Sequence, residues 1–274
     1  MDLGLTDKVV VITGGAGAIG SAAAECFLRE GCVVILGDCD QNCGEQVVKS
    51  LAGEYEGRIY FQYLDLRDED NIREFVRSIV EVHTGIDSIV NNAAVFYFEQ
   101  LVEWSTLEPL DEHYRVGLRG PATLVQESWR ICERSRSGSI VNVSSVAGHI
   151  GEPKAVAYTT IKAAQKGFTL SCAIEMSEFG GWAVSVSPGH TWTPVHQKRA
   201  SAQGLSRKEY ERSQSSIQST MFGRFLDPEE VAEWIVLAAS PVGKHLTGQD
   251  IRVTSGIESG GFNRRYETAP VEVQ

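Results

Sequence analysis

The sequence predicts a doubly wound α/β fold: a seven-stranded parallel sheet with helices on both faces. Short β-branched runs alternate with longer segments of helical periodicity, the order of elements in parallel sheets with crossover helices. The runs are apolar throughout, as expected when helices cover both faces of a sheet. The predicted strands are residues 9–13, 33–36, 59–63, 86–90, 140–143, 183–186 and 251–253.

The chain of 274 residues is predicted to form a single domain, residues 1–274, because α/β folds of this length commonly surround one sheet. Within it, residues 191–225 are polar, rich in Ser and Gln, and weakly periodic. Such a long segment inside a compact domain usually has a function, and we expect a lid over the substrate site. Residues 259–274 are expected to be a C-terminal tail.

Charge and composition exclude several classes of partner. The net charge of -11 comes from carboxylates spread along the chain, which argues against nucleic acid and anionic membranes as partners. No apolar run approaches the roughly 20 residues that span a bilayer, and the amino terminus lacks the pattern of a signal peptide. The six cysteines have no zinc-site spacing and are interpreted as reduced thiols. We therefore expect a cytoplasmic protein without a metal.

A glycine-rich turn, residues 13–20, follows the first predicted strand and precedes a helical stretch. Small residues there let the backbone approach a pyrophosphate, whose charge meets free amide groups and the positive end of a helix dipole. Alone, such a turn is a weak signal, but its position between the first strand and the first helix favours a dinucleotide site. The residues predicted to bind are Gly14, Gly17, Ala18, Ile19 and Gly20.

Asp38 ends the second predicted strand, where a carboxylate can accept hydrogen bonds from both adenine-ribose hydroxyls and repel a 2′-phosphate. Neither the glycine-rich turn nor Cys39 supplies an Arg or Lys that would neutralise such a phosphate. The sequence therefore predicts NAD as the cofactor. The alternative is that Asp38 is a solvated turn carboxylate, which is how we interpret Asp40.

Two later motifs carry a family resemblance. Ser145 precedes Tyr158 by 13 positions, and Lys162 follows Tyr158 by four, one helical turn, so that phenol and ammonium project from one face. The sequence Asn-Asn-Ala-Ala, residues 91–94, follows the fourth predicted strand. With the glycine-rich turn, these motifs resemble the short-chain dehydrogenase/reductase family over about residues 5–256, which implies a Rossmann fold. Ala18 and Ala94 stand where that family usually has glycine.

The resemblance implies NAD-dependent interconversion of a secondary alcohol and a ketone. Tyr158 would be the general acid/base and Ser145 would polarise the substrate oxygen. Lys162 would lower the tyrosine pKa, ordinarily near 10, and hold the nicotinamide ribose. Alone, a Tyr-x-x-x-Lys spacing is more often a surface pair.

The resemblance also implies further cofactor contacts and a homotetramer or homodimer. Oligomers of the family are built through central helices, here around residues 109–132 and 156–179. The adenine end would be bound by Asp65 and Leu66, and Asn92 would lie near the adenine-side ribose and brace the sheet. The additional cofactor-binding residues are Ala93, Pro188, Gly189, Thr191 and Thr193.

Gly117 stands where many members of the family have an asparagine that is thought to hold a water for a proton relay to the lysine. Three interpretations are open: slower redox turnover, a relay rebuilt from a nearby polar group, or a site adapted to an unusual substrate. His113, about one turn earlier, is a candidate replacement, although a helical histidine is more often a surface or packing residue.

Aromatic residues border the expected substrate site, which predicts a fairly apolar or aromatic-bearing small alcohol or carbonyl compound. Such a cluster is nonetheless more often core than substrate wall. Two other functions are open: a dinucleotide-binding or sensing protein with reduced turnover, and a non-redox reaction that keeps the cofactor. The predicted substrate contacts are Phe96, His149, Glu152, Trp192 and His196.

Overall fold

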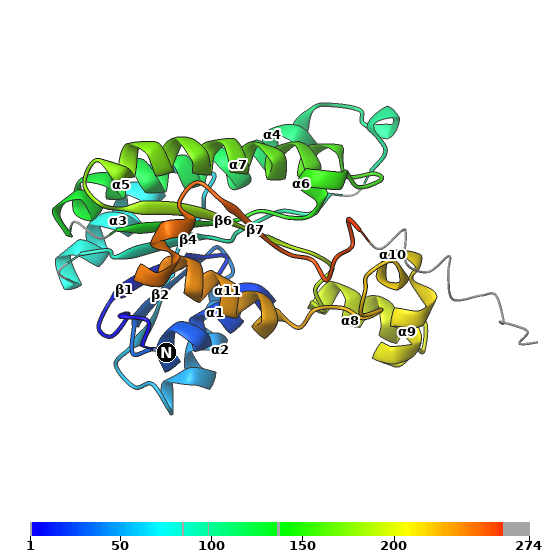
Figure 1. The fold of residues 1–274 in the computed structure, drawn as a ribbon, viewed down its shortest axis with the longest axis horizontal. Helices are drawn as coiled ribbons and strands as arrows, with labels where there is room; N and C mark the ends of the chain where they lie inside the picture. Colours follow the sequence, from blue (N-terminus) through cyan, green and yellow to red (C-terminus); the bar gives the residue numbers. More distant parts are fainter. Residues whose placement is uncertain (1, 84, 98, 136–137, 260–274) are drawn as a thin grey trace, which may run out of the picture.

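A computed structural model describes residues 2–83, 85–97, 99–135 and 138–259. Seven strands in these ranges form one parallel sheet in the order β3-β2-β1-β4-β5-β6-β7 (Figure 1). The predicted fold class is confirmed. The strands are β1 (Val9–Thr13), β2 (Val33–Asp38), β3 (Ile59–Tyr63), β4 (Ser88–Asn91), β5 (Ser139–Val143), β6 (Trp182–Pro188) and β7 (Asp250–Val253).

Helices cover both faces of the sheet. Helices α1 (Ala18–Arg29), α2 (Gln41–Ala52) and α11 (Pro228–Ala239) pack on one face. Helices α3 (Glu69–Val82), α5 (Gly120–Ser135) and α7 (Val156–Ser177) pack on the other. Shorter helical segments include α4 (Glu108–Tyr114) and α6 (Ala147–Ile150), a π-helical turn Arg115–Arg119, and 3-10 turns Leu101–Glu103 and Pro241–Leu246.

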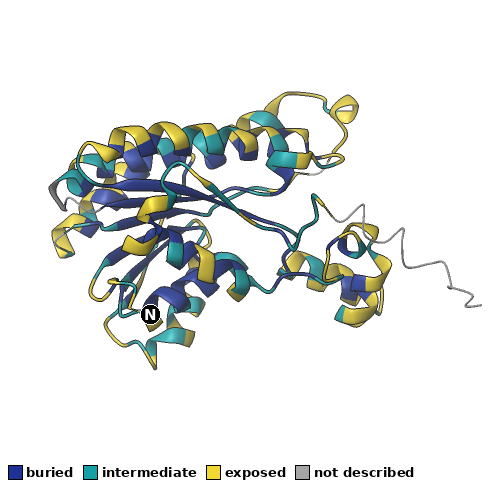
Figure 2. Cartoon of the chain, in the orientation of Figure 1, coloured by how far each residue is buried: buried dark blue, intermediate teal, exposed yellow. Residues whose placement is uncertain are grey.

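The central strands are buried on both faces. In β1, Val10 and Ile12 belong to one apolar cluster, whereas Val9 and Val11 belong to the cluster on the opposite face. Figure 2 shows the strands in the buried colour and the outward faces of the helices exposed. A strand covered on both faces needs apolar residues at every position, which explains the continuous apolar runs.

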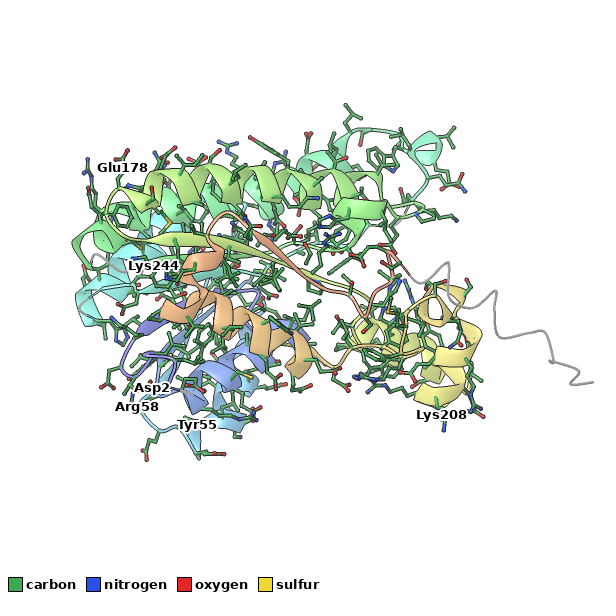
Figure 3. The ribbon with its side chains drawn as sticks, in the orientation of Figure 1. Asp2, Tyr55, Arg58, Glu178, Lys208 and Lys244 are labelled. Atoms are coloured by element: carbon green, nitrogen blue, oxygen red, sulfur yellow. The ribbon has the colours of Figure 1, made fainter. Side chains whose placement is uncertain are left out.

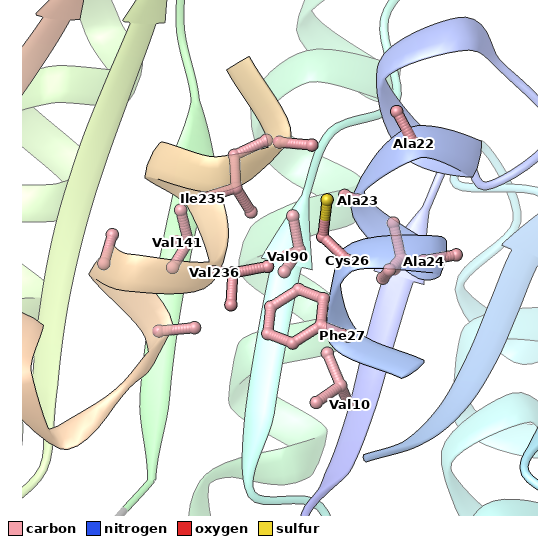
Figure 4. Packing of buried hydrophobic residues seen from close by; sticks show 14 of the residues in the cluster. Val10, Ala22, Ala23, Ala24, Cys26, Phe27, Val90, Val141, Ile235 and Val236 are labelled. Atoms are coloured by element: carbon pink, nitrogen blue, oxygen red, sulfur yellow. The ribbon is translucent and has the colours of Figure 1, made fainter. Parts of the chain in front are cut away.

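Helix α1 packs against α11, the last long helix described. Three consecutive small residues, Ala22, Ala23 and Ala24, are buried along α1, and Phe27 is fully buried near Val236 (Figure 4). Small side chains let two helices approach closely. This packing fixes α1, whose amino end follows the glycine-rich turn.

The strand order places a topological switch point between β1 and β4. After β3 the chain crosses to β4, which pairs with the opposite side of β1. Ligands of open α/β sheets bind at such a switch point, outside the carboxyl ends of the strands. Asn91 ends β4 and Thr13 ends β1, so both lie at this point.

The segment predicted as a lid folds into three short helices, α8 (Pro194–Ala202), α9 (Arg207–Ser213) and α10 (Ser215–Gln218). They enclose a separate apolar cluster that includes Tyr210 and Phe225. In Figure 3, Lys208 on this segment lies at the opposite end of the molecule from Glu178 and Lys244. A lid role stays a prediction. Of the predicted tail, residues 260–274 lie outside the described residues.

Within the described ranges, no helix combines the length and the apolar character needed to cross a bilayer.

Candidate functional site

The glycine-rich turn is shaped for close approach of a ligand. Gly14 has φ +64°, and a Cβ there would lie 2.7 Å from Ala93 Cα. A Cβ on Gly20 would lie 2.3 Å from the Gly14 carbonyl oxygen, so only glycine lets α1 start this close to the turn. No side chain caps the amino end of α1 at Gly17. The uncapped amides of the first turn, around Ala18 and Ile19, fit the pyrophosphate of a dinucleotide.

Asn92 braces this turn from the end of β4. Its Nδ2 donates to the carbonyl oxygens of Thr13 and Gly14, both at 3.0 Å. In return, the Thr13 hydroxyl accepts hydrogen bonds from the backbone amides of Asn92 and Ala93. The amide side chain therefore fixes the turn to the sheet, as the sequence suggested for this position.

Asp38 stands at the end of β2 with both carboxylate oxygens in use. Oδ2 accepts from the Ala16 amide and Oδ1 from the Asp40 amide, each at 3.0 Å. The first bond ties the predicted ribose-binding carboxylate to the glycine-rich turn. Asp40 has a different function: its side chain caps α2 by accepting from the Cys43 amide.

Asp65 and Leu66 follow β3 at the expected adenine end, and Leu66 is buried. Burial opposes ionisation of Asp65, but the charge of Arg67 together with its side-chain hydrogen bonds, at 2.7 and 2.9 Å, and its backbone amide bond lowers the pKa of the carboxyl. Arg67 also reaches Glu112 at 3.3 Å. The sequence analysis did not consider this cation, whose charge is already paired with two carboxylates.

The structure brings Ser145, Tyr158 and Lys162 together at the carboxyl end of β5. The Ser145 hydroxyl hydrogen-bonds to the Tyr158 side chain, and Lys162 Nζ lies 5.6 Å from the centre of the tyrosine ring. Two bonds hold α7 against β5: Lys162 Nζ donates to the Val143 carbonyl and Ser144 Oγ donates to the Lys162 carbonyl, both at 2.6 Å. Ser144 is therefore a structural residue.

Burial dominates the titration of the two catalytic candidates on α7. It raises the pKa of Tyr158 to about 12, against an opposing hydrogen bond from Ser145, and lowers the pKa of Lys162 to about 7. Among the protein groups, burial therefore outweighs the hydrogen bond from Ser145 in setting the pKa of the phenol. Both shifts have the same cause, because burial desolvates the charged form of each group.

Gly117 lies in the π-helical turn that joins α4 to α5, facing α7. A Cβ there would come within 2.6 Å of Ile161 Cγ2, so the site has no room for an asparagine side chain as packed. Instead, Gln165 Nε2 donates to the Gly117 carbonyl at 2.7 Å. Gln165 is buried, and its Oε1 has no hydrogen-bond partner among the described residues. A polar residue three positions after Lys162, on a buried helix face, was the signal that the sequence analysis missed.

The predicted substrate contacts separate into two groups. The Phe96 ring lies 5.2 Å from the Tyr158 ring, and Glu152 is close enough to oppose ionisation of that phenol. The other three side chains are engaged elsewhere. His149 Nε2 pairs with Asp250 at 2.7 Å, while Trp192 and His196 pack against Phe225 in the lid cluster, at ring distances of 5.2 and 4.5 Å.

The segment after β6 carries the residues expected at the nicotinamide carboxamide. Pro188 ends β6, and the Gly189 amide donates to Val253. Thr191 forms a bridge with Leu226, and Thr193 precedes the first turn of α8. These residues thus connect the sheet to the lid segment. Over the ranges that are described, no group of three or more His, Cys, Asp or Glu could hold a metal ion.

Comparison with known proteins agrees with this architecture. A family model described as short chain dehydrogenase matches residues 8–204. The chain is 35% identical over 253 residues to 3-oxoacyl-(acyl-carrier-protein) reductase of Thermotoga maritima, covering 92% of this chain and 98% of the relative. It is 29% identical over 265 residues to L-fucose dehydrogenase of Bos taurus, covering 97% and 94%.

Among solved structures, ElxO with NADP bound matches with a TM-score of 0.83 at 26% identity, covering 93% of this chain and 100% of that one. Fold, motifs and relatives agree, and the protein belongs to the short-chain dehydrogenase family of oxidoreductases.

Proposed function

We propose that the protein is an NAD-dependent oxidoreductase that interconverts a secondary alcohol and a ketone. The observation that carries the proposal is the convergence of Ser145, Tyr158 and Lys162 at the carboxyl end of β5, at the edge of the sheet that holds the glycine-rich turn. A cytoplasmic location stays part of the proposal.

The side chains divide the reaction between them. Ser145 donates a hydrogen bond to the substrate oxygen and Tyr158 takes the hydroxyl proton as hydride leaves the carbinol carbon. In reduction, Tyr158 returns a proton to the same oxygen. A bound nicotinamide supplies the hydride acceptor or donor. Lys162 holds the nicotinamide ribose and, when protonated, places a positive charge beside the phenol.

The charges around Tyr158 determine whether its phenol can act as a base. Burial is the main reason why the pKa of the phenol is raised to about 12, which is too high for a base at neutral pH. Positive charge beside the ring, from the Lys162 ammonium and from the oxidised nicotinamide, favours the phenolate. We infer that the acidification expected for Tyr158 requires the loaded site.

Asp38 supports NAD as the cofactor. Its carboxylate is fixed against the turn by the bond from the Ala16 amide, where it can accept from the ribose hydroxyls. A 2′-phosphate would meet this negative charge. Arg67, the nearby cation, has its charge taken up by Asp65 and Glu112.

Phe96 supports an apolar or aromatic-bearing surface on the substrate. Its ring is 57% exposed and lies 5.2 Å from the Tyr158 ring, so a substrate at the phenol would contact it. The segment formed by α8, α9 and α10 would close over this position as a lid.

A homo-oligomer is also proposed. On α7, Leu170 and Ile174 are 52% and 66% exposed, and a shallow depression lined by Leu118 and Phe168 lies between α5 and α7. Exposed apolar side chains on neighbouring helices suit packing against a second copy.

A second candidate is a dinucleotide-binding protein with reduced turnover or a non-redox activity. The observation that favours it is Gly117, which cannot be replaced by asparagine without moving Ile161. Intact Ser145, Tyr158 and Lys162 argue against it.

The test is a panel of secondary alcohols with NAD, and of ketones with NADH, followed by absorbance of the reduced ring. We expect turnover by the wild type, and loss of about 10²-fold or more with retained NAD binding for Tyr158→Phe. NAD binding without turnover across the panel would favour the second candidate. Turnover that survives Tyr158→Phe would contradict the assignment of the acid/base.

A further inference from the structure

His113 on α4 carries a buried hydrogen-bond acceptor without a donor. The side chain is 3% exposed, and Nδ1 lies 2.6 Å from the Pro109 carbonyl oxygen. A carbonyl only accepts, so Nδ1 carries the hydrogen and Nε2 of the neutral ring is an acceptor. Nε2 has no hydrogen-bond partner among the described residues.

The ring is part of the wall beside the catalytic phenol. It lies edge to face against the Tyr158 ring at 6.2 Å and against the Tyr97 ring at 5.6 Å. Because Nδ1 hydrogen-bonds to a carbonyl of its own helix, Nε2 lies on the part of the ring that points away from the α4 backbone. Phe96 and Tyr97, which cover this region, are 57% and 49% exposed. A buried hydrogen-bond acceptor that is left unpaired is costly, so a donor group on a bound substrate would stabilise this position.

Glu152 provides a second acceptor near the phenol. It follows α6, is half-buried, and acts electrostatically on Tyr158. Its carboxylate receives no hydrogen bond within the part of the chain that the structure describes, although the positive charge of Arg199 on α8 acts on it. Two acceptors without donors thus flank the group proposed to exchange a proton with substrate.

We infer that the substrate carries a second hydroxyl on the carbon next to the reacting carbinol, and that His113 Nε2 accepts the hydrogen bond from this hydroxyl. The substrate class is therefore a vicinal diol or polyhydroxylated ring compound, oxidised to the hydroxyketone. Glu152 would accept from a further hydroxyl. The aromatic surface predicted for the site remains compatible, because a ring polyol presents C–H groups to Phe96 while its hydroxyls reach the acceptors. This inference rests on the proposed function and makes its substrate specific.

The experiment compares trans- and cis-1,2-cyclohexanediol with cyclohexanol as substrates with NAD, using wild type, His113→Phe and Tyr97→Phe. His113→Phe keeps an aromatic ring and removes only the acceptor, whereas Tyr97→Phe is the matched change on the neighbouring ring. For the wild type we expect kcat/KM for one of the diols to exceed that for cyclohexanol by about tenfold or more. For His113→Phe we expect the ratio of kcat/KM for the diol to kcat/KM for cyclohexanol to fall to about one, and for Tyr97→Phe we expect the wild-type ratio.

A diol-to-alcohol ratio that is the same in wild type and His113→Phe, with turnover present, overturns the inference and leaves the proposed function intact. Absence of turnover by the wild type contradicts the proposed function instead. In that case the diols are titrated calorimetrically into NAD-loaded protein. Binding to the wild type that is lost in His113→Phe supports the acceptor role. Binding that is absent in the wild type, or unchanged in His113→Phe, overturns it.

Discussion

Gln165 Nε2 donates a hydrogen bond to the carbonyl oxygen of Gly117 at 2.7 Å, which links the middle of α7 to the π-helical turn before α5. The two residues form a matched pair. Absence of a side chain at 117 lets Ile161 pack against the turn, and the glutamine amide satisfies a carbonyl within it. Gly117 therefore forms part of a close contact between α7 and the turn before α5.

Gly117→Ala is expected to destabilise the fold by about 1 kcal/mol or more. The new methyl would lie 2.6 Å from Ile161 Cγ2, and overpacking of a stiff β-branched side chain outweighs the gain in helix propensity of about 1 kcal/mol. The free energy of urea-induced unfolding measures the effect. Ile161→Leu moves the methyl off the β-carbon at constant volume, so the double variant should recover most of the loss. Additive effects in this cycle would show that the contact with Ile161 is not the cause.

Asp38→Ala is expected to weaken NAD binding and to reduce the preference for NAD over NADP by about tenfold or more, because the carboxylate that accepts from ribose hydroxyls is removed. Calorimetric titration with both cofactors measures the two dissociation constants. The control is Asp40→Ala, which removes the α2 cap and costs about 1 kcal/mol of stability but leaves the cofactor ratio unchanged. An unaltered ratio in Asp38→Ala would refute the ribose-binding role.

Lys162→Met is expected to stabilise the fold at low pH. Burial lowers the pKa of Lys162 from 10.5 to about 7, so between these values the unfolded chain binds a proton that the folded chain lacks. The free energy of unfolding of the wild type therefore rises with pH between pH 7 and 10.5. Below pH 7 the cost of burying the charged Lys162 lowers it by the full amount. The variant should be more stable than wild type by on the order of a few kcal/mol at pH 6, with the difference shrinking toward pH 10.

Urea unfolding at pH 6, 8 and 10 measures this trend, and the exposed Lys49→Met is its control. A difference between Lys162→Met and wild type that does not vary with pH would mean that Lys162 is charged in the folded protein throughout.

Ile174→Asp is expected to convert the proposed oligomer to a monomer while leaving the monomer folded, because the side chain is 66% exposed on α7. Sedimentation equilibrium of the variant and wild type measures the change. Val82→Asp, at a position 76% exposed on α3, makes the same kind of substitution outside the proposed interface. Equal masses for all three proteins would exclude this face of α7 from the interface.

The sheet was predictable because its strands follow local patterns, but their ends were not. Residues 86–90 were predicted as a strand, whereas β4 begins at Ser88. Ile86 is buried ahead of the strand, and the Asp87 backbone bonds to Val9 and Ser139 while its side chain also accepts from the Val9 amide at 2.9 Å. Apolar character alone cannot distinguish the buried residues that precede a strand from the residues of the strand itself.

The site was predictable where spacing along one helix defines it, as for Tyr158 and Lys162. It was not predictable where a partner lies far along the chain. His149 was expected to contact substrate, but the structure pairs it with Asp250, 101 residues later. Likewise, the role of Gln165 depends on its hydrogen bond to Gly117, which lies on another helix and could not be identified as its partner from the sequence.

The close packing of α1 on α11 has a consequence during synthesis. The apolar side of α1, with Phe27 at its centre, is completed by residues more than 200 positions later, such as Ile235 and Val236. During synthesis, this side of α1 therefore stays uncovered until almost the whole chain has left the ribosome.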